Sequence, residues 1–260
     1  MGDSFSVDPY ASNNRMWYAK MAERLSQRLR KPLTDFYVMA GGGGGWGTYQ
    51  QFLLSEQLKS KIRPDLFVLQ FCSNDFENNY YEWERNSIVR AQFLQRPFIN
   101  TEGTGPKYAP GLIAGFYRSY LGQSRVLNRL DTEITRIQFQ YFGGYMRPLQ
   151  PNILEAYQKE SISLTTRLLS KLRRQYKDIP AVMVNCDGST SGINSVWKNM
   201  ARTAGFVPIS APSDALYAIK LQNTRLEAFI SDGSHFSEMG NQIFGRLLAD
   251  ELVAQNILLH

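Results

Sequence analysis

The sequence predicts an α/β protein with a parallel sheet that helices cover on both faces. Strand-like and helix-like segments alternate along most of the 260 residues, and this alternation is typical of parallel sheets. The composition, 43% hydrophobic and 13% aromatic, excludes a disordered or collagen-like chain and is ample for a buried core. No apolar stretch approaches the roughly 20 residues of a spanning helix, so no membrane span is expected.

The first half of the alternation begins with a predicted helix at Asn14–Arg30, where apolar residues recur at helical spacing. A short apolar run, Asp35–Ala40, leads into five consecutive glycines and is expected to be a buried strand. Helical spacing returns over Thr48–Ile62 and ends before Pro64, because proline breaks a helix. The apolar run Leu66–Cys72 predicts a second buried strand.

The alternation resumes after residue 150. It predicts, in order, the helix Pro151–Lys177, the strand Ala181–Cys186, the helix Ser191–Ala204, the strand Phe206–Ser210 and the helix Ser237–Gln255. Neither an internal repeat nor a low-complexity linker interrupts the chain, so residues 1–260 are expected to form a single domain.

An aromatic-rich insertion separates the two halves, at about residues 76–150. Glycine and proline at Gly103–Pro106 and Pro110–Gly111 favour loops around short helices. Two interpretations stay open. The segment is either a structural insertion with its own small core, or a lid or substrate wall over a functional site.

The net charge and the small number of cysteines and histidines exclude some classes of function. Lys and Arg exceed Asp and Glu by 29 to 23, a net charge of +6, but the positive charges are spread along the chain. We interpret the basicity as solvated surface and expect no nucleic-acid partner. With two cysteines and two histidines, neither a Cys-rich zinc site nor a His-rich metal centre is expected, and no cofactor is predicted.

Histidine scarcity singles out one general base. His260 is the last residue, so a hydrolase of the serine or cysteine type would use His235. Asp232 lies three residues before His235, just ahead of the last predicted helix. An Asp on such a turn can reach the imidazole and hold its tautomer, as a catalytic triad requires. A purely structural histidine is the alternative.

Three further segments lie at predicted strand ends. Gly2-Asp3-Ser4 opens the chain and can hold Ser4 on a tight turn, as a nucleophile requires. The glycine run Gly41–Gly45 can aim backbone amides at an anionic oxygen. Asn74 follows the strand Leu66–Cys72, and its side-chain amide can donate to an oxyanion or merely cap the loop.

The glycine run also permits a different function. Gly42, Gly44 and Gly47 match G-x-G-x-x-G, so a dinucleotide-binding protein is an alternative from another class. Five consecutive glycines satisfy this pattern easily, which makes the match weak. The acidic residue that such sites carry after the next strand is also missing, since Asp65 precedes that strand.

Four segments, those at Gly2–Ser4, Gly41–Gly45, Asn74 and Asp232–His235, together resemble the sequence blocks of the SGNH hydrolase superfamily, the GDSL-type esterases and acyl hydrolases. The resemblance extends from Gly2 to about Val253, apart from the insertion, and implies a three-layer α/β/α, flavodoxin-like fold. Two blocks also resemble a bacterial subgroup. They are Gly-Trp-Gly-Thr-Tyr-Gln at 45–50 and Phe-Cys-Ser-Asn-Asp-Phe at 71–76.

The resemblance implies a role for each site residue. Ser4 would be the nucleophile, His235 its general base, and Asp232 the residue that orients His235. The backbone N–H groups of Ser4 and Gly45 and the side-chain amide of Asn74 would form the oxyanion hole.

These roles imply a serine ester hydrolase. Ser4 would attack an ester carbonyl, an acyl-enzyme would form, and water activated by His235 would release the acid. The substrate stays open between a lipid, a small ester and an acetylated carbohydrate. A carbohydrate O-acyltransferase with the same triad is one alternative, and a carbohydrate-binding relative without activity is another.

The start of the chain carries a further expectation. In the family, Gly-Asp-Ser follows a central apolar strand, whereas only Met1 precedes Gly2 here. We expect the chain to be a trimmed or mis-started piece of a longer protein, lacking its first strand. The missing part could hold a signal or an anchor. We therefore expect the longer protein to be extracytoplasmic or anchored to a membrane.

Cys72 and Cys186 each end a predicted strand, and the family's strand order would make these strands neighbours. A disulfide requires Cα atoms within about 7 Å of each other. Free cysteines are among the most buried residue types, so two buried thiols are the expectation. Cys72 also departs from the family, which more often has glycine there, and this puts the local shape of the pocket in doubt.

Overall fold

The computed structural model describes residues 1–6, 12–43, 45–87, 96–112, 115, 149–187, 192–222, 228–230 and 235–258. The chain divides into two units. The first holds Met1–Ser73 and Leu169–His260, and the second holds Asn74–Leu168. The expectation of a single domain over residues 1–260 stays a prediction.

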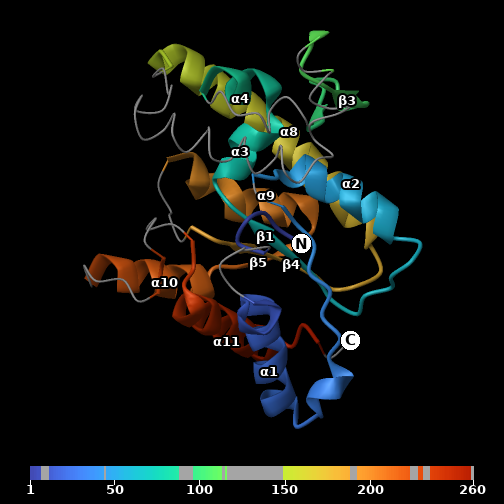
Figure 1. The fold of residues 1–260 in the computed structure, drawn as a ribbon, viewed down its shortest axis with the longest axis vertical. Coiled ribbons are helices and arrows are strands. Elements are labelled where there is room, and N and C mark those ends of the chain that lie inside the picture. Colours follow the sequence, from blue (N-terminus) through green and yellow to red (C-terminus); the bar gives the residue numbers. More distant parts are fainter. Residues whose placement is uncertain are drawn as a thin grey trace. The chain divides into compact units, whose positions relative to one another are not determined.

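The first unit is built on a parallel sheet (Figure 1). Strand β1 (Phe67–Phe71) pairs with β4 (Ala181–Asn185), and β4 pairs with β5 (Val207–Ile209), both in parallel. Each strand lies within a range that the sequence predicts. Every residue of β4 is buried, as expected for the middle of a sheet with helices on both faces.

The amino-terminal residues extend this sheet beside β1. The Met1 carbonyl accepts the N–H of Gln70 at 2.7 Å, and the N–H of Gly2 donates to the carbonyl of Gly41 at 3.0 Å. Gly2 and Gly42 form an isolated parallel bridge. Counting the paired segments 41–42 and 1–2 as strand positions, the order across the sheet is 41–42, 1–2, β1, β4, β5. This is the flavodoxin-like order 2-1-3-4-5.

Helices cover both faces of the sheet, which gives the predicted three layers. Helices α1 (Trp17–Leu29), α10 (Ala211–Gln222) and α11 (Glu238–Ala254) lie on one side of the strands, and α9 (Trp197–Ala204) lies on the other (Figure 1). The alternation along β4 explains this, because successive side chains of a strand point to opposite faces. Val182 and Val184 enter the core under α1, α10 and α11.

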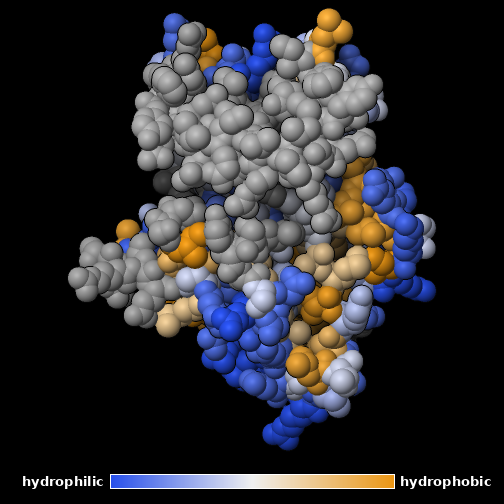
Figure 2. All heavy atoms as spheres, in the orientation of Figure 1, coloured by the Kyte–Doolittle hydropathy of each residue, from blue (hydrophilic) through white to orange (hydrophobic). Residues whose placement is uncertain are grey.

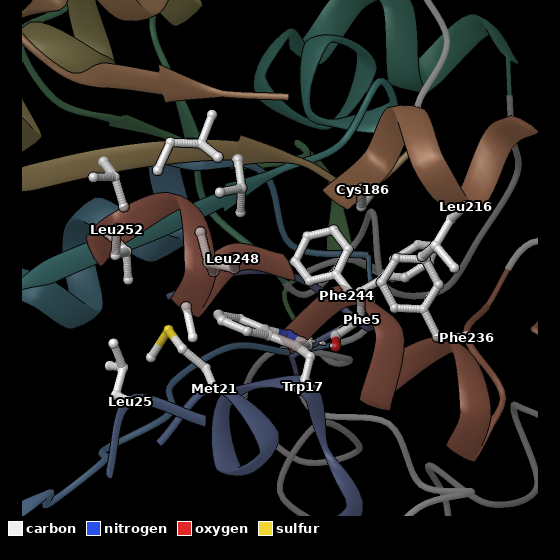
Figure 3. Close-up of a cluster of buried hydrophobic side chains, with 14 of the residues drawn as sticks. Phe5, Trp17, Met21, Leu25, Cys186, Leu216, Phe236, Phe244, Leu248 and Leu252 are labelled. Atoms are coloured by element: carbon white, nitrogen blue, oxygen red, sulfur yellow. Dashed lines mark hydrogen bonds between the residues drawn. The ribbon is translucent and has the colours of Figure 1, made fainter. Parts of the chain in front are cut away.

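That core is made of apolar residues far apart in the sequence (Figure 3). Helix α1 presents the predicted apolar face, whereas its outer face is hydrophilic (Figure 2). The main buried side chains of the core are Phe5, Trp17, Met21, Leu25, Val182, Val184, Ile209, Leu216, Phe236, Phe244, Leu248 and Leu252.

Helices α1 and α11 approach closely at Gly245. A Cβ at this position would overlap the carbonyl oxygen of Trp17 and lie 2.9 Å from the backbone nitrogen of Met21. The small residue therefore permits this packing, and a side chain of any size would force the two helices apart.

Replacing Gly245 by alanine is expected to destabilise the protein by about 1–3 kcal/mol, as overpacking does. The sign is informative, because alanine in a helix interior ordinarily stabilises by roughly 0.5–1 kcal/mol relative to glycine. Urea denaturation measures the change. Met239→Ala, at an exposed position of the same helix, should stay within about 0.5 kcal/mol. A Gly245→Ala protein at least as stable as the wild type contradicts the close approach.

One predicted strand is wrong. The segment Asp35–Ala40 begins at the end of a 3-10 turn (Leu33–Asp35) and continues without strand pairing. Tyr37 and Met39 are exposed in it, at 90% and 43%. The reason is local: backbone hydrogen bonding with the amino-terminal residues starts only at Gly41, and among the described residues no strand pairs with residues 36–40.

The other helices differ from prediction at their ends. Helix α2 (Thr48–Leu58) stops four residues early, and α1 starts after a separate 3-10 turn (Asn13–Arg15). The predicted helix Ser191–Ala204 consists of a 3-10 turn (Gly192–Val196) followed by α9. Helix α10 lies in a stretch where no helix is predicted.

The second unit contains part of the predicted insertion. Its described elements are α3 (Asn74–Asn79), α4 (Tyr81–Ser87), the antiparallel pair β2 (Phe98–Ile99) and β3 (Pro106–Lys107), and most of α8 (Pro151–Gln175). Tyr81, Phe98 and Ala109 form a small core. This agrees with the interpretation of an insertion with its own core, and the role of a lid stays a prediction. Residues 116–148, with many of the insertion's aromatic side chains, lie outside the described residues.

In the part of the chain that the structure describes, no helix is long and apolar enough to cross a membrane.

Candidate active site

A tight turn presents Ser4 directly after residues 1–2, the extended segment that pairs beside β1. The N–H of Phe5 donates to Oδ1 of Asp3 at 3.0 Å, and the N–H of Ser6 donates to the carbonyl of Asp3 at 3.0 Å. The Ser6 hydroxyl donates to Oε1 of Gln70 in β1 at 2.7 Å. Asp3 is buried. These bonds fix the backbone on both sides of Ser4.

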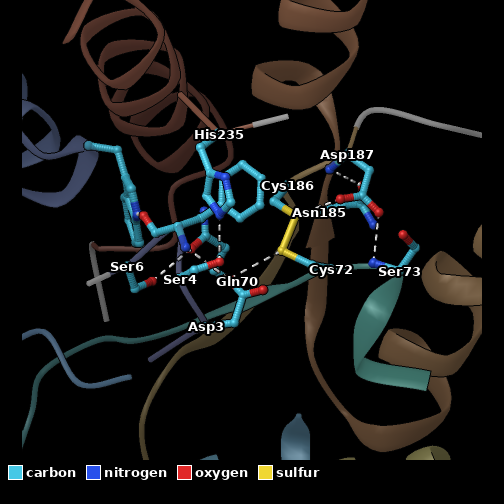
Figure 4. Close-up of a disulfide and its surroundings, with 12 residues drawn as sticks. Asp3, Ser4, Ser6, Gln70, Cys72, Ser73, Asn185, Cys186, Asp187 and His235 are labelled. Atoms are coloured by element: carbon cyan, nitrogen blue, oxygen red, sulfur yellow. Dashed lines mark hydrogen bonds between the residues drawn. A yellow bond between two sulfur atoms is a disulfide. The ribbon is translucent and has the colours of Figure 1, made fainter. Parts of the chain in front are cut away.

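His235 comes from the opposite end of the chain and points at Ser4 (Figure 4). Its Nε2 lies 2.8 Å from Oγ of Ser4. The His235 carbonyl accepts the N–H of Ile230 at 2.9 Å, and Phe229 and Phe236 form an antiparallel bridge. The imidazole is therefore carried by an anchored backbone segment just before α11.

The pair has the geometry that proton transfer needs. A general base must lie within about 2.6–3.2 Å of the heavy atom whose proton it takes, and Nε2 of His235 meets this condition at Oγ of Ser4. The structure thus brings together two of the residues that the sequence singles out, from positions 4 and 235.

The remaining predicted residues are placed less completely. Asp232 lies outside the described residues, so its contact with His235 stays a prediction. Asn74 is exposed and is the first residue of α3, which belongs to the second unit, and its part in an oxyanion hole likewise stays a prediction. Gly45 stands in the glycine loop with a φ of 67°, a left-handed conformation that suits glycine.

The glycine loop packs against the serine turn. A Cβ at Gly42 would overlap the carbonyl oxygen of Gly2 and lie 3.1 Å from that of Asp3. The close backbone approach that Gly42 allows is thus made to the serine turn of this chain. Gly44, the second glycine of the dinucleotide pattern, lies outside the described residues.

Cys72 and Cys186 form a disulfide, so the expectation of two buried thiols is wrong (Figure 4). Their Cα atoms lie 5.2 Å apart. The register of the sheet explains the pairing, because Phe71 of β1 lies opposite Asn185 of β4 and the two cysteines are the next residues. The disulfide lies next to the serine turn, with Sγ of Cys72 at 3.5 Å from Oδ1 of Asp3.

Asp187 is a site-neighbouring residue that sequence reasoning missed. Its Oδ2 accepts the N–H of Ser73 at 2.7 Å, which ties the chain after β4 to the residue before Asn74. Burial raises the pKa of the Asp187 carboxyl, while hydrogen bonds from Ser73 and the charge of Lys220 oppose this shift. The available signal was an acidic residue directly after a predicted strand.

Within the described part of the chain, Cys72, Cys186 and Asp187 are grouped closely enough to hold a metal ion. The two sulfurs are bonded to each other, and metal binding by cysteine requires the thiolate. The group is therefore interpreted as a crosslink with a neighbouring carboxylate, and no metal site is assigned to it.

No protein-family model matches the chain, and no curated protein matches its sequence. Several solved structures are similar, among them two esterases. A carbohydrate esterase family 3 protein from Talaromyces cellulolyticus is 12% identical, with a TM-score of 0.47 over 98% of this chain and 95% of that chain. An acetyl xylan esterase from the rumen bacterium Butyrivibrio proteoclasticus is 13% identical, with a TM-score of 0.47 over 99% of this chain and 63% of that chain. With TM-scores below 0.5, a function has to be argued from the residues of this chain.

Proposed function

We propose that this protein is a serine ester hydrolase in which His235 activates Ser4. One observation carries the proposal: Nε2 of His235 lies 2.8 Å from Oγ of Ser4. A serine hydroxyl is a weak nucleophile unless a neighbouring base takes its proton, and a hydrogen bond of this length between the two groups is the arrangement that does so. The tight turn at Ser4 and the anchored backbone at His235 hold both partners in place.

The proposed reaction proceeds through an acyl-enzyme. Oγ of Ser4 attacks the ester carbonyl while its proton passes to Nε2 of His235, and that proton then goes to the departing alcohol. Water, deprotonated by His235, then attacks the acyl carbon, the bond from that carbon to Oγ of Ser4 breaks, and His235 returns the proton to Oγ as the acid leaves. In this proposal Asp232 holds the imidazole tautomer, and the N–H groups of Ser4, Gly45 and Asn74 receive the negative charge of the carbonyl oxygen.

The proposed substrate class is an acyl or acetyl ester of a lipid, a small alcohol or a carbohydrate. A panel of p-nitrophenyl esters of increasing chain length, together with acetylated glycans, reports the acyl group and the alcohol separately. Hydrolysis that is present in the wild type and lost in Ser4→Ala supports the proposal. Equal rates in the two proteins for every member of the panel contradict it.

Replacing Asn74 by alanine is expected to lower kcat by about 10²–10³-fold, because one donor to the oxyanion is lost. Asn74 is exposed, so its truncation should leave the melting temperature nearly unchanged. Steady-state kinetics with p-nitrophenyl acetate measure the effect. Asn199→Ala, on helix α9, is a matched control of the same residue type and should retain the wild-type kcat. Wild-type turnover by Asn74→Ala removes Asn74 from the oxyanion hole.

A further inference from the structure

The residue after the nucleophile contacts the base. The ring of Phe5 is stacked on the imidazole of His235, with centroids 4.8 Å apart and planes inclined by 25°. No sequence pattern points to a role for Phe5, and its burial alone would class it as one more member of the core. The stacking also brings Phe5 into contact with His235, the side chain that must keep a fixed orientation toward Ser4 in the proposed reaction.

Phe5 is itself held from three sides. Its N–H donates to Oδ1 of Asp3 at 3.0 Å, and its carbonyl accepts Nε1–H of Trp17 at 3.2 Å. The edge of Phe236 packs against its ring, with centroids 4.9 Å apart (Figure 3). Phe5 is 9% exposed. The ring is therefore a fixed surface, supported by hydrogen bonds of its own backbone and by a neighbouring aromatic side chain.

A fixed aromatic surface limits how the imidazole can turn. Rotation about the bond that joins the ring to Cβ swings Nε2 away from Oγ of Ser4, and it also tilts the imidazole out of its stacked plane. Aromatic pairs of this kind contribute about 0.5–1.5 kcal/mol beyond their buried area. Turning the ring away from Ser4 therefore loses a favourable contact as well as the hydrogen bond.

We propose that Phe5 is a positioning residue, which acts through His235 by holding Nε2 of the imidazole in line with Oγ of Ser4. One short segment, Asp3–Phe5, would then set both the nucleophile and the orientation of its base. The proposal rests on the proposed function of Ser4 and His235. In the proposal Phe5 takes no part in a chemical step and acts only through its contact with the imidazole.

The test compares variants at position 5 by kinetics. In Phe5→Leu, which keeps an apolar side chain but removes the ring, kcat for p-nitrophenyl acetate and the rate of fluorophosphonate labelling of Ser4 are expected to fall together, by about 3- to 10-fold. KM should change little, because Phe5 does not contact the ester. Phe5→Tyr keeps the ring and should restore kcat to within about 2-fold of the wild type.

A matched control separates positioning from packing. Phe244→Leu removes a ring from the same core, where Phe244 is fully buried and packs on Phe236 and Trp17. It should lose stability to a similar degree as Phe5→Leu while keeping the wild-type kcat at a temperature where it is folded. An equal loss of kcat in Phe244→Leu and Phe5→Leu overturns the proposal.

A spectroscopic readout does not depend on enzymatic activity. The chain has two histidines, so in the His260→Gln background all imidazole signals come from His235. The stacked Phe5 ring should shift the imidazole C–H protons upfield in the NMR spectrum, and Phe5→Leu or Phe5→Met should abolish this shift. Imidazole signals at random-coil positions in the folded wild type overturn the stacking. If the shift is present but wild-type Ser4 does not react with the fluorophosphonate, the proposed function fails and the stacking does not.

Discussion

Replacing His235 by alanine is expected to lower kcat for ester hydrolysis by about 10⁴-fold or more. Without the His235 imidazole, no base takes the proton of Ser4 Oγ during its attack, and no acid gives a proton to the departing alcohol. Steady-state kinetics with an activated acetyl ester give the ratio. His235 is only half-buried, so the melting temperature should change little.

The chain supplies its own control for this experiment. His260 is the other histidine, and His260→Ala should retain the wild-type kcat. In the proposed mechanism Ser4 and His235 act as one unit, so the double variant Ser4→Ala/His235→Ala should be no slower than the worse of the two single variants. A His235→Ala protein that keeps more than a few per cent of the wild-type rate contradicts the assigned base.

Replacing both Cys72 and Cys186 by serine is expected to lower the free energy of unfolding by about 2–5 kcal/mol. The bond closes a loop of 114 residues, and a crosslink across so long a loop removes much of the entropy of the unfolded chain. Urea denaturation with and without a reducing agent measures the effect. Reduction should destabilise the wild type and leave the double variant unchanged.

The thiol count decides whether the bond is present. Wild-type protein taken from cells, denatured without reduction, should show no free thiol, because both cysteines are in the bond. Disulfides persist mainly in oxidising compartments, and on this ground we propose, as the sequence leads us to expect, an extracytoplasmic or membrane-anchored parent protein. Two free thiols, together with a wild-type stability that does not respond to reductant, contradict both the bond and this location.

The alternation of strands and helices could be predicted because it depends on local apolar patterns. Strands β1, β4 and β5 lie within predicted ranges, since each falls in a mainly apolar run, and β1 and β4 are almost entirely buried in the sheet. Asp35–Ala40 carries a similar apolar pattern and forms no strand. The difference lies in whether a neighbouring strand is present to pair with, and a local pattern contains no information about neighbours.

The site could be predicted in part, for a similar reason. Ser4 and His235 were found because the chain offers a serine on a Gly-Asp turn and, apart from its last residue, one histidine. The stacking of Phe5 on His235 and the disulfide between Cys72 and Cys186 are contacts between residues distant in sequence. They depend on the register of the sheet and the packing of its ends, which only the folded chain shows.

The most direct test of the proposed function is the reaction of Ser4 with a fluorophosphonate probe, followed by mass spectrometry of the labelled peptide. We expect stoichiometric labelling of Ser4 in the wild type, none in Ser4→Ala, and labelling slowed by orders of magnitude in His235→Ala. Ser6, two residues away and hydrogen-bonded to Gln70, should remain unmodified. A folded wild-type protein whose Ser4 stays unlabelled, or whose labelling does not depend on His235, contradicts it.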